Sequence, residues 1–68
     1  MELSAHAWEQ INDRKMTEAE VAGAIEYGAR WHCNLDPEIH YARQGDVFVV
    51  MHGPSDWVIT TYRVGDEE

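Results

Sequence analysis

The chain has 68 residues, of which 13 are acidic and five are basic, so its formal net charge is −8 at pH 7. This length leaves room for one small hydrophobic core and excludes a second domain. The single cysteine excludes an internal disulfide, and the longest apolar run, Val47 to Met51, is far too short to span a bilayer.

The first half of the sequence predicts a helical hairpin. Ser4 is a good N-cap, and the apolar residues after it recur at helical spacing, so we expect a first helix at about residues 5–14. After a tight connection, Thr17 and Glu20 form a capping-box pattern that begins a second helix at about residues 18–28. We expect Gly28 to end this helix in the left-handed conformation that glycine accepts.

The second half predicts strands at 39–43, 47–52 and 57–62, separated by turns rich in glycine, proline, asparagine and aspartate. The middle strand is apolar at nearly every position, which is typical of a central strand. We expect the strands to follow one another in a meander. The side chains expected to face the helices are Val47, Val49 and Met51, together with Ile59.

These elements predict one α+β domain over residues 1–64, in which an N-terminal helical hairpin packs on a three-stranded antiparallel β-meander, followed by an acidic tail at 65–68. A short extra strand at residues 31–33 stays open as an alternative. A strand that begins before residue 30, or a parallel pair of strands, would contradict this arrangement.

The negative charge is concentrated in the predicted helices. Residues 1–29 contain six acidic and two basic residues, whereas residues 30–64 contain four acidic and three basic residues. Nucleic-acid-binding proteins usually present a basic face to the phosphates, and this sequence has no basic cluster. Two interpretations remain. The acidic surface keeps the protein soluble, or it docks on a basic protein partner, such as one that itself binds nucleic acid.

Several short motifs resemble a RelE/BrnT-like family of unknown function. The opening residues Ser4 to Ala7, then Arg14 and Thr17 to Val21, are similar to the family's start, and Val58 to Arg63 is similar to its closing strand. The resemblance covers most of the chain and is weakest over residues 30–45. It implies the ribonuclease-like fold of the barnase, EndoU, colicin and RelE group, with toxin-like or phage-associated relatives. Gln10 stands where the family often has an arginine, which removes a phosphate-binding cation.

Metal-independent RNA cleavage needs proton-transfer groups and cations on the phosphate. Histidine titrates near neutral pH, and His6 and Arg14 are just over two helical turns apart, so both lie near one helix face. The candidate catalytic residues are His6, Arg14, Arg63 and Tyr62, with Arg43 as a further cation. The competing interpretation is that His6 packs at the junction of helix and sheet and that Arg14 pairs with a neighbouring acid.

A second set of residues could in principle bind zinc: His32, Cys33, His40 and His52. Their spacing matches no zinc module, so we expect no metal and no other cofactor. Cys33 fits a small buried hydrophobic residue better than a nucleophile.

The binding hypothesis rests on acidic and aromatic residues. An acidic ridge along the hairpin is expected from Glu9, Asp13, Glu18 and Glu26. Trp57, which opens an expected edge strand, is the candidate exposed aromatic anchor. We therefore expect a small acidic protein that binds a basic protein partner, for example a phage-type inhibitor of a nucleic-acid machine. The alternative is a toxin-like endoribonuclease that acts on RNA.

The remaining expectations concern location and assembly. The N-terminus lacks the basic and apolar regions of a signal peptide, and a lone cysteine suits a reducing compartment, so the sequence predicts a cytoplasmic protein that does not bind membranes. Because a domain of this size is marginally stable, a homodimer is a further alternative.

Overall fold

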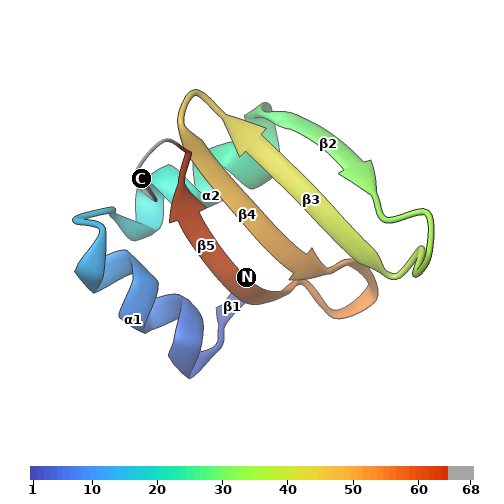
Figure 1. Ribbon diagram of the computed structural model, residues 1–68, viewed down its shortest axis with the longest axis horizontal. Coiled ribbons are helices and arrows are strands. Elements are labelled where there is room, and N and C mark those ends of the chain that lie inside the picture. The colour runs from blue at the N-terminus through green and yellow to red at the C-terminus, as the bar shows by residue number, and fades with distance from the viewer. Residues whose placement is uncertain (65–68) are drawn as a thin grey trace.

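The computed structural model describes residues 1–64, so the predicted acidic tail at 65–68 lies outside the described residues. The elements in chain order are β1 (Glu2–Leu3), α1 (Ala5–Asp13), α2 (Glu18–Tyr27), β2 (Ala29–His32), β3 (Ile39–Gln44), β4 (Val47–His52), the 3-10 turn η1 (Gly53–Ser55) and β5 (Trp57–Arg63). Together they confirm the α+β class. In Figure 1, α2 passes behind β3 and β4, and α1 lies beside β5.

Both helices begin where the sequence predicts, because their first amide groups are capped. The Ser4 hydroxyl accepts a hydrogen bond from the Ala7 amide at 3.0 Å and donates one to the Ile59 carbonyl at 2.7 Å. It therefore caps α1 and also attaches the helix to β5. At α2, the Thr17 hydroxyl accepts from the Glu20 amide, and the Glu20 carboxylate accepts from the Thr17 amide at 2.9 Å. The predicted capping box is confirmed.

Gly28 ends α2 as predicted, but the predicted left-handed conformation is wrong. Its backbone is extended, with φ −82° and ψ 178°, which any residue can adopt. Glycine is required there because a Cβ atom would meet the Arg43 and Ala24 carbonyl oxygens. The close approach of α2 to β3 therefore explains this residue.

The predicted three-stranded meander is wrong, because the described strands form a five-stranded mixed sheet in the order β1-β5-β4-β3-β2. Strands β2 to β5 do follow one another antiparallel, but β2 begins at Ala29, before residue 30. Strand β1 pairs parallel with β5, with Glu2 opposite Trp57 and Leu3 opposite Val58. Two residues are too few to carry a strand pattern, so this pairing is decided by contacts across the fold.

The core lies between the helices and one face of the sheet. Val47, Val49 and Met51 are buried there, as predicted. Ile59 is not part of this core, which corrects its predicted position. The register of β5 against β4 shifts at this point, because Val50 pairs with Thr60 and Met51 pairs with Val58. The β-bulge thus places Val58 and Thr61 toward the helices in place of Ile59.

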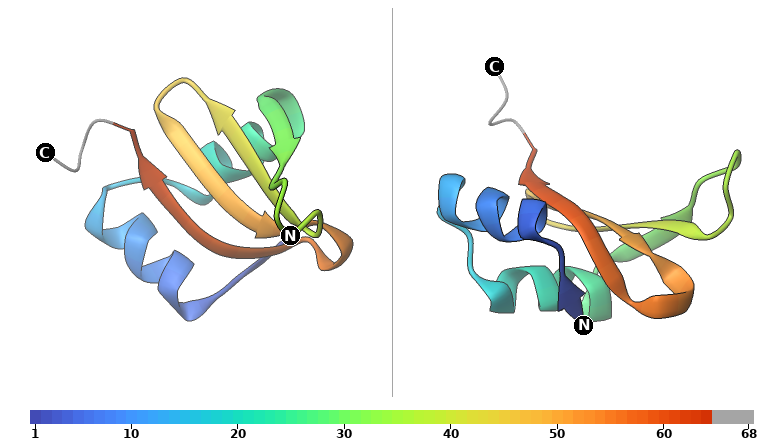
Figure 2. Two further views of the ribbon diagram at one scale, coloured as in Figure 1. Left: turned by 45° about the vertical axis from the view of Figure 1, so that its right-hand side comes forward. Right: turned by 90° about the horizontal axis from the view of Figure 1, so that it is seen from below.

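The helices leave the other face of the sheet uncovered, and Figure 2 (left) shows both of them away from it. Because side chains alternate along a strand, residues between the buried positions point to this uncovered side. We call it the open face. From β2 to β5 it carries Trp31, Ile39, Tyr41, Arg43, Phe48, Val50, His52, Trp57, Thr60 and Tyr62.

Within residues 1–64, no helix is long and apolar enough to cross a membrane.

Candidate functional surfaces

The first two candidate catalytic residues lie on α1 and are joined through Gln10. The Gln10 amide nitrogen lies 3.4 Å from His6 Nε2, and Arg14 Nε donates to the Gln10 side-chain oxygen at 3.3 Å. The three side chains follow one another at intervals of four residues along one helix face. His6 and Arg14 are therefore on one face, as the spacing predicts. Gln10 lies between them on this face.

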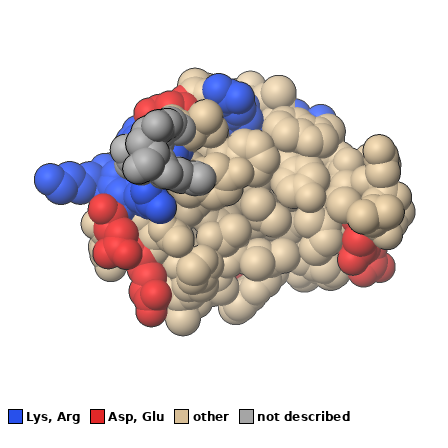
Figure 3. Space-filling model, viewed as in Figure 1, with Lys and Arg blue, Asp and Glu red and all other residues tan. Residues whose placement is uncertain are grey.

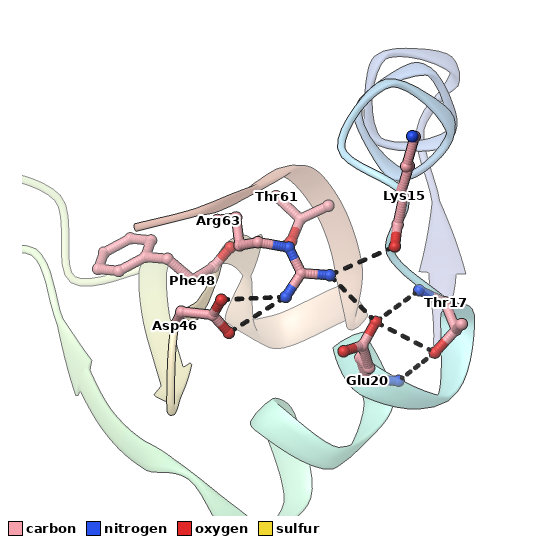
Figure 4. A network of polar contacts seen from close by, with 7 residues as sticks. All are labelled: Lys15, Thr17, Glu20, Asp46, Phe48, Thr61 and Arg63. Carbon is pink, nitrogen blue, oxygen red and sulfur yellow. Dashed lines mark hydrogen bonds and ion pairs between the residues drawn. The ribbon is translucent and has the colours of Figure 1, made fainter. Parts of the chain in front are cut away.

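Arg63 is engaged in a network of polar contacts that joins four parts of the chain (Figure 4). Its guanidinium donates to both carboxylate oxygens of Asp46, at 3.0 and 3.2 Å. It also donates to the Lys15 carbonyl at 3.3 Å and lies 3.5 Å from a carboxylate oxygen of Glu20. Two carboxylates thus compensate its positive charge, which disfavours a role in holding a phosphate.

Tyr62 lies on the open face, away from the Arg63 network. Its ring stacks on Phe48, with ring centroids 4.9 Å apart. Neighbouring residues of a strand point to opposite faces of the sheet, so Tyr62 and Arg63 diverge. The structure links His6 and Arg14 through Gln10, and it places Tyr62 and Arg63 on opposite faces of β5.

The acidic candidates all lie on the solvent side of the helices, where Glu9, Asp13, Glu18 and Glu26 are exposed. Within residues 1–64, none of these four carboxylates takes part in an ion pair or a hydrogen bond. Glu20, by contrast, is occupied by the capping box and Arg63. Within residues 1–64, the helices therefore present four exposed carboxylates that have no ion-pair partner.

Trp57 is exposed, with 41% of its surface accessible. Its strand is not the edge of the sheet, because β1 lies beyond β5. Trp57 pairs with His52 and so belongs to the open face, whereas α1 and α2 pack on the other face. The acidic candidates and this aromatic candidate therefore occupy different sides of the sheet.

An aromatic cluster that the sequence interpretation did not assemble lies on the open face. The ring of Trp31 lies 5.7 Å from those of both Tyr41 and Phe48, and the latter two are 5.9 Å apart, all between centroids. Tyr62 extends the cluster by stacking on Phe48. The signal that could have found it is the alternation along β3 and β4, which sends Tyr41 and Phe48 to the same side.

The open face is largely uncharged. In Figure 3 the middle of the surface over β3 to β5 carries no lysine, arginine, aspartate or glutamate, and charged side chains lie at its margins. Arg43 lies at one end, beside the β3–β4 turn. At the other end, Glu38 Oε1 lies 3.3 Å from His52 Nε2. The protein thus has an acidic helical surface and an apolar sheet surface.

The histidines and the cysteine are dispersed. Within the described part of the chain, no three side chains of histidine, cysteine, aspartate or glutamate are arranged to hold a metal ion. His40 accepts a hydrogen bond from Arg30 at 3.3 Å, and His52 Nδ1 lies 2.8 Å from the Ser55 hydroxyl. Cys33 is half-buried and does not join the core, so its predicted place as a buried hydrophobic residue is wrong.

Comparison of the chain with family models, curated proteins and solved structures returned no match. The resemblance to the RelE/BrnT-like family therefore rests on the short motifs of the sequence and stays a prediction.

Proposed function

We propose that this protein acts by binding another protein, and that the carboxylates of its two helices attract a partner with a basic surface. The observation that carries the proposal is the group of four exposed carboxylates, Glu9, Asp13, Glu18 and Glu26, which have no cationic partner within residues 1–64. Uncompensated charges of one sign raise the rate at which an oppositely charged surface associates.

The positions of the catalytic candidates favour binding over RNA cleavage. Phosphate cleavage needs cations that are available to the substrate, and Arg63 is held by Asp46 and Glu20. Tyr62 points to the opposite side of β5. If the RelE-like resemblance holds, this chain is a catalytically silent member that binds. A phage-type inhibitor of a nucleic-acid machine in the cytoplasm fits that role, since proteins that bind nucleic acid present basic surfaces.

The test begins with capture of partners from host lysate on the immobilised chain, with bound protein and bound RNA both identified. The association rate of the captured protein is then measured with wild type and with the double variant Glu18→Lys, Glu26→Lys. We expect the variant to associate roughly tenfold more slowly, because electrostatic steering depends on the charge facing the partner. Added salt should slow association of the wild type.

The matched control is the double variant Glu2→Lys, Asp36→Lys, which changes the net charge equally but leaves both helices intact, since Glu2 lies on β1 and Asp36 in the turn between β2 and β3. Its association should stay near that of wild type. If neither added salt nor the Glu18→Lys, Glu26→Lys variant changes the association rate, the acidic surface serves only to keep the protein soluble.

The same preparations are incubated with RNA. Cleavage by the wild type that falls by about 10²–10⁴ in His6→Ala, the range for a lost general acid or base, would support the endoribonuclease alternative instead. Arg14→Ala should then impair cleavage as well.

A further inference from the structure

The open face has the composition of a buried surface. An antiparallel sheet with one solvated side normally alternates apolar and polar residues, and only strands covered on both sides are apolar throughout. Strand β4 is apolar from Val47 to Met51. Its inward residues meet the helices, whereas Phe48 and Val50 point to the open face. The sequence of β4 therefore fits a strand covered by a second layer, which residues 1–64 do not supply.

We propose that a second copy of this chain covers the open face, so that two sheets stack face to face in a homodimer. This inference is independent of the proposed function, because it uses the sheet and leaves the acidic helices outside the interface. Stacked sheets lie about 10 Å apart, with side chains of the two faces interdigitated. The aromatic cluster would form the centre of this interface, with Trp31 and Trp57, now 44% and 41% exposed, buried by the partner copy.

The charges at the ends of the open face are self-complementary, which favours a second copy over an unrelated partner. Arg43 lies at one end of β3 and Glu38 precedes its other end, about 17 Å away for five extended residues. A two-fold axis between the sheets and perpendicular to the strands reverses one copy over the other. Arg43 of each chain then lies above Glu38 of the partner copy, and two equivalent ion pairs form.

Other occupants fit the face less well. The four residues that follow Val64 are glycine and acidic residues, so this stretch offers no apolar side chain to cover the sheet. Single-stranded nucleic acid stacks on aromatic rings beside several cations. Among residues 1–64, Arg43 is the one lysine or arginine on the open face, and the chain as a whole carries a net charge of −8. The uncharged aromatic centre, with Arg43 at one end and Glu38 at the other, matches a copy of itself, and Glu2, opposite Trp57 on β1, adds a second carboxylate near the Glu38 end.

The first experiment follows the purified protein by sedimentation velocity from about 1 μM to about 1 mM, with the indole N–H resonances recorded over the same range. We expect a monomer–dimer equilibrium and concentration-dependent shifts of Trp31 and Trp57. Trp8 is as exposed as Trp31 but lies on α1, so it serves as the internal control and should shift less. Trp31→Lys should abolish the dimer. A monomer throughout the range, or shifts confined to Trp8, would overturn the proposal.

The second experiment swaps the charges and does not depend on whether Trp31→Lys folds. Arg43→Glu and Glu38→Arg should each raise the dimer dissociation constant by roughly tenfold, because each change affects two ion pairs. The double variant should return to within about threefold of wild type. Lys15→Glu and Glu26→Arg make comparable charge changes away from the open face and should leave the constant unchanged. Single variants without effect, or a double variant that is not rescued, would overturn the proposed arrangement.

Discussion

At the scale of single residues, Cys33 has an environment that the sequence does not reveal. It follows β2 directly, and its amide donates to the Ile39 carbonyl at 2.9 Å. The backbone N–H groups of Leu35 and Asp36, followed by the Tyr41 hydroxyl, stabilise the thiolate and lower the pKa of Cys33 below its ordinary value. The same contact raises the pKa of Tyr41, because the phenol donates to the sulfur. The turn after β2 and the Tyr41 hydroxyl thus favour the thiolate form of the chain's single cysteine.

The lowered pKa predicts that Cys33 reacts faster than an ordinary thiol at neutral pH, since the thiolate is the nucleophile. The rate of alkylation by iodoacetamide, measured against pH, should have its midpoint below that of a cysteine in the urea-unfolded chain. Tyr41→Phe removes one of the donors and should move the midpoint upward, while the two backbone amides continue to hold it below the unfolded value. Equal midpoints for folded and unfolded protein would contradict this assignment.

At the scale of elements, Arg63 connects parts that are distant in the sequence. From the end of β5 it reaches the β3–β4 turn through Asp46, the connection between the helices through Lys15, and the first turn of α2 through Glu20. Glu20 is at the same time the acceptor of the capping box. Arg63, which its residue type made a candidate for holding a phosphate, therefore connects the elements of the fold in this structure.

Replacement of Arg63 by alanine should lower the free energy of unfolding by about 1–2 kcal/mol, because each partly exposed ion pair contributes less than about 1 kcal/mol and several contacts are lost together. For a domain of this size that corresponds to a fall in Tm of roughly 5–15 °C, measured by circular dichroism. Arg30→Ala is the matched control, since Arg30 is exposed and donates to His40 at 3.3 Å from the edge strand. If the Arg63→Ala variant has the same Tm as the Arg30→Ala control, the Arg63 network contributes nothing to the stability of the fold.

For the domain as a unit, residues 1–64 form one small core that is packed on one side of the sheet only. Small domains bury a low fraction of their surface and are marginally stable. The helices and the inner face account for the core, and the aromatic cluster on the open face adds a second apolar surface that remains half exposed. Burial of that surface between two copies would add stability that the single chain lacks.

Dimerisation through the open face predicts that the Tm of the protein depends on its concentration. When folding is linked to dimerisation, a hundredfold higher concentration adds about 2.7 kcal/mol per dimer, and Tm should rise by roughly 5–10 °C. Calorimetry at about 10 μM and about 1 mM, in the same buffer, measures the rise. In Trp31→Lys the midpoint should no longer change with concentration. A wild-type midpoint that is constant over this range would contradict linkage between folding and assembly.

The local elements of this protein follow from its sequence alone. The starts of both helices, the positions of β3, β4 and β5 and the turns between them depend on residues within a few positions of one another, such as Ser4 with Ala7 and Thr17 with Glu20. The turn at Gly45, with φ 62°, also depends on residues that are close in the sequence. Alternation along β4 also groups Val47, Val49 and Met51 on one face of the strand. These features are predictable because neighbouring residues interact whatever the rest of the chain does.

Which distant groups meet depends on the complete fold. The parallel pairing of β1 with β5, the bulge that displaces Ile59 and the close approach that requires Gly28 depend on strands and helices brought together from opposite ends of the chain. The candidate sites also depend on contacts between distant parts of the chain. Arg63 is neutralised by residues 17 and 43 positions away, and the aromatic cluster takes its rings from four strands. Residue types predict what a side chain can do, whereas its surroundings in the fold decide whether it does so.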